Sequence, residues 1–127
     1  MPDLDRDATR RLALHLTPAE AWRSAPPDAP YAAGSLAVEG FIHLTHRADD
    51  LIEGANERYR DDRRPQVALL VDLVRLESPW RYDGDDRFPH VYGPLDRAAI
   101  VAVLPVRRDA SGRFLAIGEP GAQAGQR

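Results

Sequence analysis

Two uninterrupted apolar runs, at residues 67–71 and 98–104, constrain the fold of this chain more than any other feature. Runs of this length without polar alternation are typical of strands that lie inside a sheet with both faces covered. They predict buried strands over residues 67–73 and 98–106, and the second is expected to stop near Pro105, because proline cannot donate to a strand ladder. Neither run is long enough to cross a bilayer.

Shorter segments complete the predicted fold. Further strands are expected at residues 12–16, 41–45, 80–82 and 113–117. Helices are expected at residues 18–24, 35–39 and 46–59. The first of these follows a capping box formed by Thr17 and Glu20. The pattern predicts one α+β domain over residues 12–117, a flexible N-terminus at residues 1–11 and a disordered tail at residues 118–127.

The composition excludes several kinds of chemistry. All 17 basic residues are arginines, and the chain contains neither lysine nor cysteine. Disulfides, thiolate nucleophiles, cysteine–zinc sites and Schiff bases are therefore excluded. The arginines are dispersed and balanced by 20 acidic residues, so no nucleic-acid partner is indicated. No signal-like segment precedes the first predicted strand, and we expect a cytoplasmic protein without a membrane partner.

Two His-Leu-Thr triplets each end a predicted strand. Strand alternation places His15 and His43 on the faces opposite the leucines, where a general acid and a general base could meet. Two histidines in such positions predict a shared polar pocket. Thr17 fits better as the N-cap of the following helix, whereas Thr45 fits an N-cap and the pocket equally well.

The second candidate site element is a loop predicted over residues 84–94, which contains the sequence FPHVYGP. Its two prolines and its glycine restrict the backbone, while Phe88, His90 and Tyr92 offer an aromatic platform, an imidazole and a phenol. A rigid loop with such side chains is a common way to present a ligand site. The alternative is a loop whose aromatic rings only fill the core.

Charged residues near these elements extend the predicted site. Glu39 can point into the site of His43, although a solvated turn residue is an equally good interpretation. Arg81 or Arg87 would hold an anionic group of the ligand. His46, at the start of a helix, is interpreted as a surface residue.

The segments SLAVEGFIHLT (35–45) and FPHVYGPL (88–95) together resemble the bacterial domain-of-unknown-function family 952. The frame around them is also similar: a histidine in the first strand, Trp22 soon after it, and a valine-rich last strand. The resemblance covers about residues 12–106. It implies an ADP-ribosyltransferase-like fold, with split antiparallel sheets and two or three short helices.

The same resemblance implies a cleft between two small sheets that could hold a nucleotide such as NAD. His15 would line one wall, His43 the next, and His90 would close the cleft. Many relatives have a Trp-Glu pair where this chain has Tyr82 and Asp83, so an aspartate here reaches one methylene less far. No glutamate stands where a working ADP-ribosyltransferase would use one to stabilise its transition state.

The sequence therefore predicts two sets of site residues. The catalytic set is His43, His90, His15 and Tyr92. The ligand-binding set is Thr45, Phe88, Trp22, Glu39, Arg81, Arg87 and Asp83. No metal is predicted, because the histidines lack the local spacing of a zinc site.

Three functions remain open from the sequence. The first is a nucleotide- or NAD-related transferase or hydrolase in which His43 and His90 exchange protons. The second is a two-histidine phosphoesterase that uses His15 and His43. The third is a non-catalytic module for a small-molecule ligand, or a biosynthetic enzyme that has reused the pocket. The oligomeric state is left open.

Overall fold

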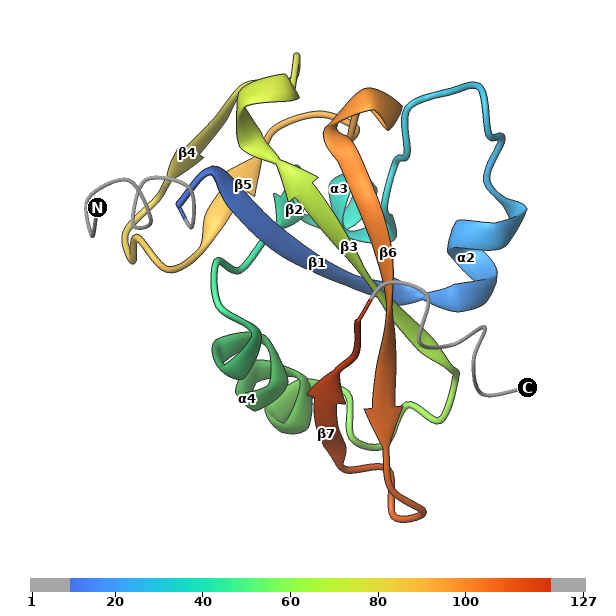
Figure 1. Ribbon diagram of the computed structural model, residues 1–127. Coiled ribbons are helices and arrows are strands. Elements are labelled where there is room, and N and C mark those ends of the chain that lie inside the picture. The colour runs from blue at the N-terminus through green and yellow to red at the C-terminus, as the bar shows by residue number, and fades with distance from the viewer. Residues whose placement is uncertain (1–9, 120–127) are drawn as a thin grey trace.

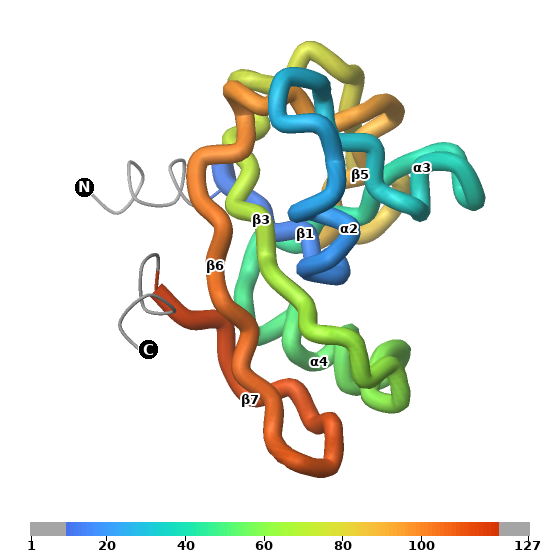
Figure 2. The backbone as a smooth tube through the Cα atoms, turned by 90° about the vertical axis from the view of Figure 1, so that its right-hand side faces the viewer, coloured from blue at the N-terminus to red at the C-terminus, as the bar shows by residue number. Residues whose placement is uncertain are grey.

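The computed structural model describes residues 10–119, whose strands form two antiparallel sheets (Figures 1 and 2). The larger sheet has the order β1 (Leu12–Pro18), β3 (Gln66–Asp72), β6 (Ile100–Arg108) and β7 (Phe114–Ile117). The smaller sheet has the order β2 (Ile42–His43), β5 (Pro89–Val91) and β4 (Trp80–Tyr82). The predicted α+β class with antiparallel strands is confirmed. The expectations for residues 1–9 and 120–127 lie outside the described part of the chain.

Three α-helices and two 3-10 turns connect the strands. The helices are α2 (Ala19–Ser24), α3 (Gly34–Glu39) and α4 (Ala48–Arg58), and the turns are η1 (Leu73–Arg75) and η2 (Arg97–Ala99). In Figure 1, α4 lies beside β7 and β1, with which it is in contact. No helix within residues 10–119 is long and apolar enough to span a membrane.

The larger sheet separates two apolar layers, because alternate residues of its strands point to opposite faces. Leu14, Ala68 and Leu104 point to one face and form a core layer that also includes Leu51 of α4. The other face contributes Ala13, Leu69 and Val71 to a larger core that includes Ile42 and Val91 of the smaller sheet. The space between the sheets is therefore filled by side chains and is not the cleft that the resemblance implied.

Backbone hydrogen bonds join the two sheets at one edge. Leu14 N donates to Thr45 O at 2.7 Å, and Thr45 N donates to Leu14 O at 2.8 Å. Thr45 lies two residues after the end of β2. The bridge between Leu14 and Thr45 therefore sets how the smaller sheet curls across β1. The face of β2 that carries Ile42 is thereby turned toward the larger sheet.

The two apolar runs have different environments. The first is confirmed as a central strand, because β3 pairs with β1 and β6 and is buried along almost all its length. The second was wrongly predicted to be buried on both faces, since Val101 and Val103 of β6 are 45% and 38% exposed. Pro105 does not end β6, which continues to Arg108. Its carbonyl accepts from Gly118 N at 2.7 Å on the β7 side, so the missing N–H does not interrupt pairing with β3.

The predicted capping box is wrong. β1 continues through Pro18, and α2 begins at Ala19 without a side-chain cap. The Thr17 hydroxyl instead bonds the Tyr31 hydroxyl at 2.6 Å in the core. Thr45 caps no helix either, because α4 begins only at Ala48 and also has no side-chain cap.

The predicted loop at residues 84–94 contains β5, the central strand of the smaller sheet. Proline and glycine at both ends of the segment favoured a loop over a strand of only three residues. Pro89 and Val91 are nevertheless buried, while His90 between them points to the opposite face.

Candidate functional site

The outer face of the smaller sheet carries most of the predicted site. His43 lies opposite His90 on the neighbouring strand, and His90 lies opposite Arg81. Directly opposed residues of antiparallel strands point to the same face. Since the adjacent residues Ile42 and Val91 point into the core, this row of two imidazoles and a guanidinium faces away from the larger sheet.

An aromatic cluster surrounds the two imidazoles. The His43 and His90 ring centroids are 5.3 Å apart at an interplanar angle of 77°. Phe41 stacks on His90 at 4.1 Å and 21°, meets His43 edge-on at 4.8 Å, and lies tilted against Tyr92 at 5.5 Å. Phe41 was not predicted as a site residue, although strand alternation places it on the face of His43. Its packing restricts the rotation of the His90 ring.

Asp83 is the centre of a hydrogen-bond network. Its Oδ2 accepts from His90 Nδ1 at 2.8 Å and from the Tyr92 hydroxyl, and its Oδ1 accepts from Arg81 Nε at 2.6 Å. These three donors, the Tyr92 hydroxyl first, hold the pKa of Asp83 far below its usual value. The same carboxylate raises the pKa of Tyr92. Asp83 is therefore an anion, and the His90 nitrogen that faces it carries the proton.

Glu39 supports the second imidazole. Glu39 Oε1 accepts from His43 Nε2 at 2.8 Å, and both side chains are partly exposed. Gly40 makes this contact possible: it ends α3 with φ of 87°, a left-handed conformation that favours glycine. The turn carries the chain from Glu39 at the end of α3 back into β2.

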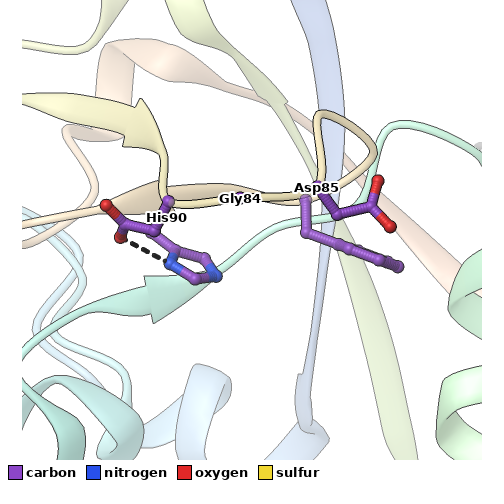
Figure 3. Close-up of a pocket in the computed structure, with 5 residues that line it drawn as sticks. Gly84, Asp85 and His90 are labelled. Atoms are coloured by element: carbon purple, nitrogen blue, oxygen red, sulfur yellow. Dashed lines mark hydrogen bonds and ion pairs between the residues drawn. The ribbon is translucent and has the colours of Figure 1, made fainter.

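A hollow of about 140 Å³ opens beside His90, lined also by Asp83, Gly84, Asp85 and Phe88. Figure 3 shows the His90 ring between its carboxylate partner and the side of the hollow that carries Asp85. The ring edge away from the dashed bond faces this space, and it carries Nε2. The hollow is smaller than the roughly 300–1,000 Å³ that is usual for ligand pockets.

Arg87 lies at the rim of this hollow. Its NH2 donates to Asp85 Oδ2 at 2.6 Å, and its guanidinium lies 4.9 Å from the centre of the Phe88 ring. It also approaches Asp50 at 3.6 Å. Two carboxylates therefore compensate the charge of Arg87, which makes Arg81 the better placed of the two predicted anion-binding residues.

His15 does not join the other two imidazoles. It lies on the inner face of β1, opposite Leu69, and is 7% exposed. Its Nδ1 donates to the backbone oxygen of His43 at 2.8 Å. Burial lowers the pKa of His15 to about 4, so the ring is neutral near pH 7. His15 supports the backbone of β2 and has no direct role on the outer face.

Two other predicted ligand contacts also lie apart from the outer face. Trp22 packs edge-on against Tyr31 at 5.2 Å, and the guanidinium of Arg97 lies over its ring at 4.4 Å. Thr45 is buried at the bridge to β1. Both residues therefore serve the packing of the fold.

His46, interpreted as a surface residue, is half-buried between two sheets. Its Nδ1 donates to Leu12 O and its Nε2 accepts from the Tyr82 hydroxyl, each at 2.8 Å. Within residues 10–119, no group of three or more histidine, aspartate or glutamate side chains is arranged to hold a metal ion.

The model of a family described as "Protein of unknown function (DUF952)" matches residues 16–103. The chain belongs to the DUF952 family. The matched range contains both imidazoles of the outer face together with Glu39 and Asp83. No curated protein matches this DUF952 chain.

Solved structures of protein CC0527 from Caulobacter crescentus have a similar fold. The crystal structure is 23% identical in sequence, with a TM-score of 0.68. The superposed region covers 82% of this DUF952 chain and 93% of the CC0527 chain. The solution NMR structure is also 23% identical, with a TM-score of 0.62, and covers 92% and 99%. At this identity the likeness shows the fold alone. These neighbours do not confirm the ADP-ribosyltransferase-like fold that the resemblance implied.

Proposed function

We propose that the chain is a cytoplasmic hydrolase or transferase that uses histidine acid–base catalysis on a small nucleotide-type ligand. The observation that carries this proposal is the pair of carboxylate-bound imidazoles, His43 and His90, at 5.3 Å on one solvent-facing surface. A general acid and a general base that act in one step must both reach the same substrate.

His90 is the candidate general base. Asp83 accepts from Nδ1 and so keeps the lone pair on Nε2, which has no hydrogen-bond partner within residues 10–119. Nε2 would take a proton from water or a ligand hydroxyl as that oxygen forms a bond to the electrophilic atom of the ligand. His43, held by Glu39 at Nε2, would give a proton from Nδ1 to the leaving oxygen as the bond between that oxygen and the same atom breaks. Exchange with solvent then restores both rings.

Arg81 is the candidate anchor for an anionic group. Its Nε is bound to Asp83, and its guanidinium lies 4.3 Å from the centre of the Tyr92 ring. The side chain is still 67% exposed, so the outer edge of the guanidinium is available to a ligand phosphate. Such a charge-assisted bond is typically stronger than one between neutral groups.

Two parts of this proposal, NAD as the ligand and the ADP-ribosyltransferase-like fold, are supported only by the family resemblance. A hollow of about 140 Å³ is too small to enclose a whole dinucleotide. We therefore assign the hollow to the reacting end of the ligand, with Phe88 as its apolar wall and the remainder of the ligand extending over Arg81.

A second candidate function is a two-histidine phosphoesterase. The facing pair of His43 and His90 favours it, whereas the pair suggested by the sequence, His15 and His43, is divided between a buried layer and the outer face. The two candidates share the imidazoles and differ in the bond that is broken.

Calorimetric titration with NAD, ADP-ribose and 2′,3′-cyclic AMP, combined with product analysis by NMR, tests these functions. Turnover of NAD or ADP-ribose supports the first function, and turnover of the cyclic phosphate alone supports the second. Binding without turnover would leave a ligand-binding module and contradict catalysis. No binding at millimolar concentrations would contradict the whole proposal.

The Arg81→Gln variant is expected to bind the active ligand about tenfold or more weakly, because a hydrogen bond to a charged group contributes about 1.5–3 kcal/mol. Arg23→Gln is the matched control: Arg23 is exposed, its one ion pair within the described part of the chain is with Glu20 at 3.4 Å, and it lies on α2, away from the site. Equal affinity of both variants in the same titration would show that Arg81 does not bind the anion.

A further inference from the structure

One end of the molecule is rich in arginine. It consists of residues 57–64, where α4 ends, and residues 107–113, the hairpin between β6 and β7, which we call the arginine end. Both views place the end of α4 and this hairpin together (Figures 1 and 2). Arg63 NH2 donates to Ala110 O at 2.6 Å, and Arg60 NH2 donates to Ser111 Oγ at 3.4 Å.

Arg108 holds the two segments together. Its guanidinium donates to the carbonyls of Tyr59, Arg60, Arg64 and Gly112 at 3.0–3.3 Å. It also lies 4.0 Å from the centre of the Phe114 ring. All four acceptors are neutral carbonyls, and Arg108 has no ion pair within residues 10–119; the pKa of Asp62 is lowered first by its hydrogen bond to Arg64 and only to a smaller extent by the charge of Arg108.

The arginines at this end differ from those elsewhere in their partners. The end contains seven arginines and four carboxylates, although the whole chain has a net charge of -3. Within residues 10–119, seven of the eight other arginines form ion pairs with carboxylates, whereas only Arg64 does so here. The six without such a partner are Arg58, Arg60, Arg63, Arg107, Arg108 and Arg113. Available guanidinium groups of this kind suit an external anion.

Tyr59 adds an aromatic ring to this basic surface. Its side chain is 43% exposed, and it is flanked in sequence by Arg58 and Arg60. Its backbone is fixed by the bonds Tyr59 N to Ala55 O at 2.7 Å and Arg108 NH2 to Tyr59 O. An exposed aromatic ring on a fixed backbone, close in sequence to guanidinium groups, is a combination that can bind unpaired bases and their phosphates.

We propose that the arginine end binds the phosphate backbone of single-stranded nucleic acid, with one base stacked on Tyr59. Guanidinium groups match phosphate oxygens in pairs and stack well, so they fit a phosphodiester chain better than ammonium groups do. The remaining surface is acidic overall, which restricts the contact to a few phosphates. The sequence hides this surface, because its two segments are separated by 42 residues and only the fold brings them together.

Fluorescence anisotropy with a labelled 12-nucleotide oligo-uridine, measured between 20 and 200 mM salt, tests this proposal. The triple variant Arg58→Gln, Arg107→Gln and Arg113→Gln removes three positive charges. These three side chains form no hydrogen bond or ion pair within residues 10–119. It is expected to weaken binding at least tenfold and to reduce the salt slope by about two, since each phosphate contact on a single strand contributes about 0.7. Tyr59→Leu is expected to remove about tenfold of the preference for single over double strands.

The control triple variant is Arg10→Gln, Arg23→Gln and Arg47→Gln, which changes the net charge equally at arginines that are paired with carboxylates. It is expected to bind as the unmodified chain does. If both triple variants bind the oligonucleotide equally weakly, net charge alone explains the effect and the proposal is overturned. Equal binding of duplex and single strand, or binding to phosphatidylserine vesicles without binding to the oligonucleotide, would also overturn it.

Discussion

The Asp83→Asn variant is expected to move the proton of His90 from Nδ1 to Nε2 and to lower turnover by about two to four orders of magnitude. A carboxylate only accepts, so it requires a proton on the imidazole nitrogen that faces it, whereas an amide can also donate. With the proton on Nε2, the nitrogen beside the hollow no longer accepts a proton from the attacking oxygen. Loss of one acid–base group typically costs about 10²–10⁴ in rate.

Long-range ¹H–¹⁵N spectra of the imidazoles identify the protonated nitrogen of His90 independently of any activity. Asp86→Asn is the matched control, because Asp86 is an exposed neighbour whose one ion pair within residues 10–119 is with Arg10, at 3.5 Å. Thermal unfolding of both variants shows whether the fold is kept. An unchanged tautomer in a folded Asp83→Asn protein would contradict the role assigned to this carboxylate.

Stability is expected to fall between about pH 6.5 and pH 4 because of His15. Its folded-state pKa is about 4, below the usual histidine pKa of 6.5, so the unfolded chain takes up the proton first as the pH falls. The free energy of unfolding then decreases by up to about 1.4 kcal/mol per pH unit, about 3 kcal/mol in all. Above pH 6.5 both states are neutral and this effect is absent.

The His15→Asn variant isolates this contribution. Asparagine places an amide N–H near the position of Nδ1, so the bond to the backbone oxygen of His43 can be kept without a titrating group. Urea unfolding at several pH values is expected to show the stability difference between the two proteins shifting by about 3 kcal/mol toward the variant as the pH falls from 7 to 4. A difference that stays constant with pH would contradict the burial of a neutral imidazole.

Asp72 provides an internal check on the same curves. It is buried and accepts from Arg11, whose hydrogen bond lowers its pKa. This stabilisation is present above the ordinary aspartate pKa of 3.8 and is lost only as the pH falls below that value toward the folded-state pKa. Both proteins contain Asp72, so its effect cancels in their difference.

The sequence predicted the elements with a strong local signal. The apolar run of β3 identified the central strand, and alternation in β1 placed His15 opposite the leucines. The run of β3 predicted that both faces of its sheet are covered, but not that α4 covers one face and the smaller sheet covers the other. A histidine on the face opposite the leucines was therefore predicted to line a pocket, although that face is a second core layer.

The outer face of the smaller sheet was only partly predictable. His43, Glu39 and His90 were predicted as site residues from their types and positions, and the structure places them on one face. Their convergence depends on β5, a three-residue strand between glycine and proline signals that no local pattern distinguishes from a loop. Phe41 was missed because a phenylalanine beside a strand predicts core packing rather than contact with an imidazole.

An NMR titration of the four histidine side chains tests the central claim most directly, because each of them has a defined environment. During addition of the ligand that binds among NAD, ADP-ribose and 2′,3′-cyclic AMP, the ring signals of His43 and His90 are expected to shift together. Those of His15 and His46, which are bonded inside the fold, are expected to stay in place. Shifts centred on His15, with His43 and His90 unmoved, would contradict a site on the outer face of the smaller sheet.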